Sequence, residues 1–114
     1  MASPNVEQWR PLVTSIWPMD QVDNTLAVMA CESGGNPSAR ALTQQEDSRG
    51  LMQINVLAHP DAANLNLYDP ETNLRYAYQL WDASGWGPWS CASTLAITGG
   101  GNAVGLPLGG AEGG

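Results

Sequence analysis

The sequence predicts a small, mainly α-helical domain. Apolar side chains recur at helical spacing in residues 6–17 and again in residues 22–31. A third segment, residues 70–83, opens with the helix-start signal Asp69-Pro70-Glu71 and carries one apolar face. With 114 residues, of which 43% are hydrophobic, the chain is long enough for one domain with a modest core.

The first two helices have their own boundary signals. Pro18 ends the segment 6–17, and Pro11 allows its helix to begin there, with proline in the first turn. Asp20 is expected to cap the second helix. This helix is apolar on most sides, so we expect it to be buried. A glycine pair at 34–35 ends it.

The connections before the third helix are harder to assign. Residues 36–49 are polar and aperiodic, and we expect an exposed loop that forms one wall of a cleft. Residues 50–55 fit a short helix or a strand, with Leu51 and Ile54 towards the core. Residues 59–67 are expected to be a loop.

The C-terminal part begins with a rigid aromatic turn, Gly-Trp-Gly-Pro-Trp-Ser-Cys, at residues 85–91. Trp86 fits a ligand groove and the core equally well, and Trp89 fits the core or the cleft wall. Residues 91–98 are apolar enough for a last short helix. Glycine then becomes so frequent that we expect residues 1–98 to form the domain and residues 99–114 a flexible tail.

Composition excludes several classes of partner. The net charge is -7, with four Arg and no Lys, so there is no basic stripe for nucleic acid. No apolar run is long enough to span a membrane. The single His59 has no partner at metal-site spacing, so neither a metal nor a cofactor is expected. Cys31 and Cys91 form either a disulfide or two buried thiols, and spacing alone leaves both open.

Glu32 is the strongest candidate for chemistry. It follows an apolar helix and precedes a glycine stop, so its carboxylate lies at a helix C-terminus and partly out of water. The negative end of the helix and desolvation both disfavour the charged form. A carboxylic acid that stays protonated near neutral pH can donate a proton to a leaving group.

Three segments, in this order, resemble the goose-type lysozyme and soluble lytic transglycosylase family. They are Glu-Ser-Gly-Gly-Asn-Pro-Ser-Ala at 32–39, Gly-Leu-Met-Gln-Ile-Asn at 50–55 and Leu-Tyr-Asp-Pro-Glu-Thr-Asn-Leu at 67–74. The resemblance spans residues 26–91. It implies a lysozyme-like fold with a catalytic cleft, and cleavage of the β-1,4 bond between N-acetylmuramic acid and N-acetylglucosamine in peptidoglycan.

The resemblance also implies roles for single residues. Glu32 matches the catalytic carboxylate of the family. Ser33, Met52 and Gln53 match positions that shape the sugar cleft, and Asn73 matches a structurally placed Asn.

Two departures from the family pattern affect the mechanism. The family's Ala-Tyr-Asn-Ala-Gly segment is missing, so Tyr78 or a tryptophan such as Trp86 is a candidate to replace its tyrosine. Asn55 stands where goose-type hydrolases carry an Asp, which leaves Asp47 or Glu46 as the possible second carboxylate. We therefore expect a lytic transglycosylase, with a hydrolase as the alternative.

Three further expectations concern the setting of the protein. The non-enzymatic alternative is an inactive glycan-binding or virion structural module, and chitin is the alternative substrate. The first residues lack a signal peptide, so we expect a phage-encoded endolysin, made in the host cytoplasm. It would act as a monomer on the bacterial cell wall, in the periplasm or outside the cell.

Overall fold

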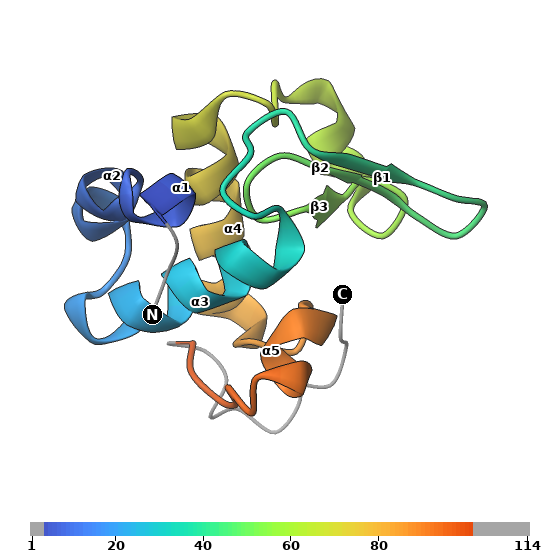
Figure 1. Cartoon of the computed structure of the whole chain (residues 1–114). Helices are drawn as coiled ribbons and strands as arrows, with labels where there is room; N and C mark the ends of the chain where they lie inside the picture. Colours follow the sequence, from blue (N-terminus) through green and yellow to red (C-terminus); the bar gives the residue numbers. More distant parts are fainter. Residues whose placement is uncertain (1–3, 102–114) are drawn as a thin grey trace.

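Helix α3 (Val22–Glu32) packs against the three elements that precede it in the chain and against the last helix (Figure 1). The computed structural model describes residues 4–101. The remaining elements are α1 (Pro4–Glu7), α2 (Arg10–Ile16), the 3₁₀ turn η1 (Met19–Gln21), β1 (Arg40–Leu42), β2 (Asp47–Arg49), β3 (Ile54–Asn55), the 3₁₀ turn η2 (Pro60–Asn64), α4 (Pro70–Ser84) and α5 (Ser90–Thr94). The mainly α-helical prediction is confirmed.

The N-terminal segment forms two helices where the apolar spacing also allowed one. Trp9 lies between α1 and α2, and Pro11 lies in the first turn of α2, as the sequence indicated. Asp20 does not cap α3. It lies inside η1, and Gln21 precedes α3 without a side-chain capping bond.

Helix α3 ends where the glycine pair begins. The Gly34 N–H bonds to the carbonyl oxygens of Met29 and Ala30. Gly35 has a φ of +81°, and a side chain there would collide with the backbone of Asn5 in α1. The close approach of α1 to the end of α3 therefore requires glycine at position 35.

Residues 36–49 are not the featureless loop that their polarity predicted. They contain β1 and β2, which pair antiparallel with Arg40 opposite Arg49, and β3 adds to β2 with Ser48 opposite Asn55. Asp47 and Ser48 are 7% and 2% exposed, whereas Gln44 and Gln45 at the hairpin tip are exposed as expected. The pairing of β1 with β2 was missed because strands of only three residues are too short to show hydrophobic alternation.

An aromatic cluster fills the space between the N-terminal helices and α4. Trp17 packs against Tyr78, Trp81 and Trp86, with ring centroids 5.4–5.7 Å apart. Trp86 also packs edge to face against Trp89. These contacts assign Trp86 to the core.

The chain beyond α4 follows its expected course only in part. Asp69 caps α4, since its carboxylate accepts the N–H of Thr72 at 2.9 Å. Helix α5 is shorter than predicted and ends before Ala96, which has a φ of +59°. Gly99 accepts the backbone N–H of Trp86, and residues 102–114 of the predicted tail lie outside the described residues.

The structure joins Cys31 and Cys91 in a disulfide, with 6.0 Å between their Cα atoms. This settles the choice that the sequence left open, in favour of the bridge. None of the described helices has the length and apolar character needed to cross a membrane.

Candidate active site

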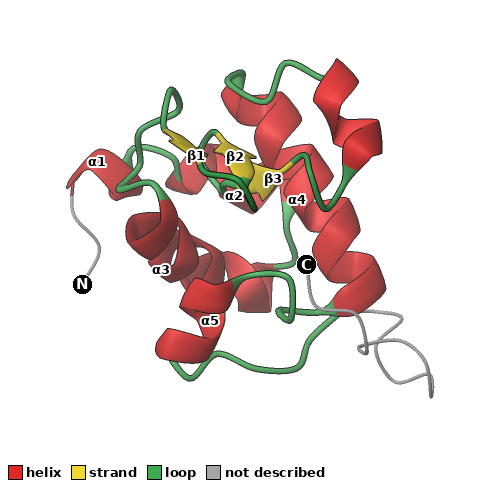
Figure 2. Ribbon diagram, turned by 90° about the vertical axis from the view of Figure 1, so that its right-hand side faces the viewer, coloured by secondary structure: helices red, strands yellow, loops and turns green. Residues whose placement is uncertain are grey.

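Glu32 lies in a cleft at the C-terminal end of α3. In Figures 1 and 2 the sheet and α5 lie on opposite sides of this helix end. The cleft has a volume of about 320 Å³ and is lined by the end of α3, the hairpin, β3 and the residue before it, the residue before η2, α4, and the start of α5 with the turn that precedes it. Its lining residues are Glu32, Gln45, Glu46, Ser48, Gln53, Ile54, Asn55, His59, Leu80, Pro88, Trp89 and Ser90.

Burial raises the pKa of Glu32 to about 7. This value already includes two smaller effects: the backbone N–H of Cys91 bonds to the carboxylate and lowers the pKa, and the negative charge of Glu46 raises it. The side chain is half-buried, so it is removed from much of the solvent yet still faces the cleft. A carboxyl group with this pKa is present in both protonation states near neutral pH, as a general acid and base requires.

Gln53 and Asn55 lie on the sheet side of the cleft. The side-chain amide of Gln53 donates to the carbonyl oxygens of Ala39 and Gly50, at 3.1 and 3.0 Å, which leaves its Oε1 to accept from a ligand. Asn55 uses its Oδ1 to accept the N–H groups of Asp47 and Leu57, which leaves its NH₂ group to donate. The two side chains therefore offer complementary polar groups to a sugar.

Asn73 holds the segment that carries Gln53 in place. It is fully buried at the start of α4. Its Oδ1 accepts the N–H of Met52, and its amide donates to the carbonyl oxygens of Arg49 and Leu67. Gly50 lies against this amide with a φ of +80°, where a side chain would collide with it. The positive φ of Gln53, 50°, follows from the same tight turn.

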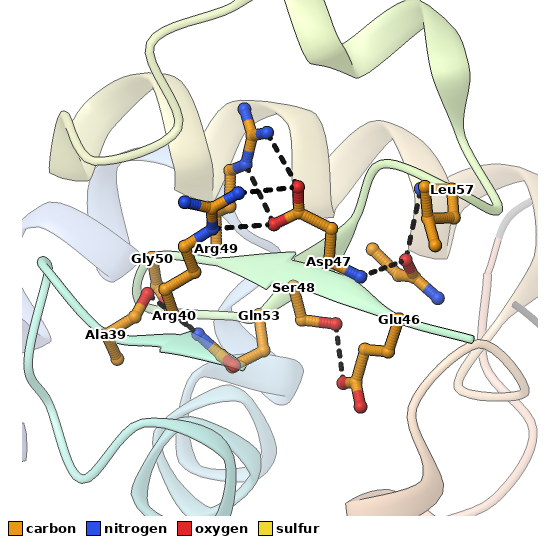
Figure 3. A network of polar contacts seen from close by, with 10 residues as sticks. Ala39, Arg40, Glu46, Asp47, Ser48, Arg49, Gly50, Gln53 and Leu57 are labelled. Atoms are coloured by element: carbon orange, nitrogen blue, oxygen red, sulfur yellow. Dashed lines mark hydrogen bonds and ion pairs between the residues drawn. The ribbon is translucent and has the colours of Figure 1, made fainter. Parts of the chain in front are cut away.

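The two candidate second carboxylates lie on opposite sides of the hairpin (Figure 3). Asp47 is bound by the guanidinium groups of Arg40 and Arg49, at 2.8–3.2 Å, which hold the pKa of Asp47 well below its usual range. Glu46 lines the cleft instead and accepts the hydroxyl of Ser48 at 2.6 Å. Of the two, only Glu46 faces Glu32.

Four residues expected in the cleft lie elsewhere. Met52 is fully buried in the core, so only its neighbour Gln53 reaches the cleft. Ser33 closes the end of α3, donating to the Met29 carbonyl and accepting the Gly35 N–H. Tyr78 and Trp86 pack in the aromatic cluster, and the indole N–H of Trp86 is bonded to Gln21. Tyr78 and Trp86 are therefore not positioned to replace the missing family tyrosine.

Several cleft residues were missed by sequence reasoning. His59 drew notice only as a histidine without a metal partner, yet it lines the cleft beside Asn55. Leu80 and Ser90 carried no signal, because their positions depend on how α4 and α5 dock. Trp89 does form the cleft wall, and its indole N–H donates to the Met52 carbonyl at 2.9 Å. Within residues 4–101, no three His, Cys, Asp or Glu side chains are grouped so that they could hold a metal ion.

Comparison with known protein families matched residues 17–91 to the lysozyme-like domain. Separate comparisons with curated proteins and with solved structures found no match. The match covers most of the chain and includes α3, the sheet and α4. The chain therefore belongs to the lysozyme-like domain family. This membership associates it with cleavage of glycosidic bonds in peptidoglycan.

Proposed function

We propose that this protein is a muramidase that cleaves the bond between N-acetylmuramic acid and N-acetylglucosamine, with Glu32 as the general acid and base. The observation that carries the proposal is the half-buried Glu32 carboxyl in a cleft, with a pKa raised to about 7. Protonated Glu32 donates its proton to the glycosidic oxygen as the bond breaks, and an oxocarbenium-like centre develops on the muramic sugar.

We further propose that the product is a 1,6-anhydro sugar, as in a lytic transglycosylase. The N-acetyl group of the substrate stabilises the positive centre. Ionised Glu32 then takes the proton of the sugar's 6-hydroxyl, whose oxygen closes onto the anomeric carbon. Two observations support this route: Asp47 is fully engaged by two Arg side chains, and an amide, Asn55, stands on the sheet side of the cleft.

Hydrolysis is a second candidate, favoured by one observation. Glu46 lines the same cleft as Glu32, and its charge affects the pKa of Glu32. A second carboxylate in this position can activate a water molecule that attacks the anomeric carbon. The cell wall, in the periplasm or outside the cell, is the proposed place of action for either route.

Digestion of purified peptidoglycan, followed by mass spectrometry of the fragments, tests the proposal. We expect anhydro ends, which lack one water relative to reducing ends. Glu32→Gln keeps the shape of the side chain but removes the acid, and it should reduce the rate by about 10²- to 10⁴-fold. Glu71→Gln is the matched control, because Glu71 is exposed on α4 and pairs with Arg75 outside the cleft.

The outcomes separate the candidates. If Glu32→Gln cleaved peptidoglycan as fast as the wild type, the proposed role of Glu32 would be refuted. If all products had reducing ends, and Glu46→Gln lost most of its activity, the protein would be a hydrolase and not a transglycosylase. Cleavage of chitin oligomers without cleavage of peptidoglycan would change the substrate class.

A further inference from the structure

The disulfide and Glu32 are directly connected. Cys31 precedes Glu32 in α3, and its sulfur is bonded to that of Cys91 in α5. The backbone N–H of the same Cys91 bonds to the Glu32 carboxylate. Cys91 therefore contacts the end of α3 in two ways: its sulfur is bonded to that of Cys31, and its backbone N–H is bonded to the carboxylate of Glu32.

The segment around Cys91 also forms one wall of the cleft. Pro88, Trp89 and Ser90 line it, directly before Cys91, and α5 packs against α3. Helix α5 has only five residues, Ser90–Thr94, and a helix of that length is not stable without tertiary contacts. The covalent bond to α3 is thus a main constraint that holds this wall against Glu32.

We propose that the Cys31–Cys91 disulfide is a positioning element for Glu32, and that the enzyme is fully active only in its oxidised form. The inference rests on the proposed function of Glu32. A dithiol such as dithiothreitol supplies two electrons and two protons: the S–S bond breaks, each cysteine becomes a thiol, and the reductant closes to a cyclic disulfide. Cys31 is exposed, so a reductant can reach the bond.

Release of the α5 segment changes the surroundings of Glu32 in a defined direction. Burial is the largest cause of its raised pKa, and the α5 side of the cleft supplies part of that burial. The other titratable groups that line the cleft are Glu46 on the hairpin and His59 before η2. The cleft residues from α4, from the turn before α5 and from the start of α5, among them Leu80, Trp89 and Ser90, are uncharged. Loss of the wall admits water and returns the pKa of Glu32 towards 4.5.

The resulting loss of activity depends on pH. A full return of the pKa from about 7 to 4.5 lowers the protonated fraction of Glu32 about two hundredfold at pH 7.5, but only about fourfold at pH 5. A bridge that served stability alone would leave the activity of protein that is still folded unchanged, or lower it by one common factor at both pH values. The pH dependence of the loss therefore distinguishes positioning from stabilisation.

The experiment compares oxidised wild type, reduced and alkylated wild type, and the double variant Cys31→Ser/Cys91→Ser. Peptidoglycan cleavage is measured from pH 5 to pH 8, and circular dichroism confirms that each form is folded. Sucrose, which favours the folded state, is present throughout because removal of the bridge weakens the domain. Dithiothreitol added to the double variant controls for effects of the reductant that do not involve the bridge.

We expect both bridge-free forms to lose up to about two hundredfold in activity at pH 7.5 but no more than about fourfold at pH 5. An equal loss at all pH values, or no loss, would overturn the inference. Circular dichroism identifies any form that is unfolded. The activity of whichever bridge-free form is folded then decides the question. Inactivity of the oxidised wild type would instead refute the proposed function, so the two failures are distinguishable.

Discussion

Replacement of Glu32 by Gln should make the protein more stable above neutral pH while it removes activity. The wild-type carboxyl must ionise in a half-buried position beside Glu46. Glutamine has the same shape, does not ionise, and can still accept the N–H of Cys91 through its side-chain oxygen. The substitution therefore removes the cost of the charge without creating a cavity.

The magnitude follows from the pKa of Glu32. A rise from 4.5 to about 7 corresponds to about 3 kcal/mol of stability, and partial screening by water in the open cleft reduces this to roughly 2 kcal/mol. Because the folded protein binds this proton more tightly than the unfolded chain, the contribution is fully present below pH 4.5. It is lost as the pH rises to about 7. Glu32→Gln should therefore match the wild type near pH 4 and exceed it by roughly 2 kcal/mol at pH 8.

Urea unfolding of the oxidised proteins at pH 4 and pH 8 measures this difference. The control is Glu71→Gln, which removes an exposed carboxylate that pairs with Arg75. It should change the free energy of unfolding by no more than about 0.5 kcal/mol, without the gain at high pH. A difference between Glu32→Gln and wild type that is the same at both pH values would refute the raised pKa, and with it the main argument for a general acid.

Four other predictions follow from the same geometry. Glu46→Gln removes a negative charge near Glu32, so the pKa of Glu32 should fall. The alkaline limb of the pH–activity profile should then move to lower pH. An unchanged limb would show that the charge of Glu46 does not affect Glu32. Asn73→Ala leaves three buried backbone groups without partners and should cost about 3 kcal/mol or more in urea unfolding, and a loss below about 1 kcal/mol would show that they find others. Replacing Cys31 and Cys91 together by Ser should lower the free energy of unfolding by about 4 kcal/mol, because the bridge closes a loop of about 60 residues. Reduced wild type should unfold at the same urea concentration as this double variant. A difference between their unfolding midpoints would show that the substitutions act in another way than by removing the bridge. Activity on intact walls should rise with moderate salt, since the chain carries a net charge of -7 and cell walls are anionic, whereas a steady decline would oppose this.

The helices were largely predictable because their signals are local. The start of α4 is specified by Asp69 and Pro70, which act within one turn, and the apolar face of this helix repeats at a regular interval. The end of α3 is specified by the glycine pair at 34–35. Glu32 could be placed at that helix end for the same reason, without knowledge of the rest of the fold.

The walls of the cleft were less predictable because they depend on long-range docking. Met52 and Gln53 are neighbours in an irregular turn, where no periodic pattern states which side chain faces inward; the bonds from Asn73 decide it. Trp86 fitted groove and core equally well in the sequence, and only its stacking on Trp17 assigns it to the core. Asp47 and Glu46 were equivalent candidates until the pairing of β1 with β2 separated them.

This pairing has a consequence for how reliably the cleft assembles. Alternate residues of a strand face opposite ways, so a shift of β2 by one position would turn Asp47 towards the cleft and Ser48 away from it. The short strands have too few apolar side chains to prevent such a shift by burial alone. Arg40 and Arg49 lie directly opposite each other and would repel, but both bind Asp47, and this arrangement exists in one alignment only. The ion pairs of Asp47 with Arg40 and Arg49 therefore fix the register of β1 and β2. This register points Ser48 into the cleft, where its hydroxyl bonds to Glu46 and holds that carboxylate in position.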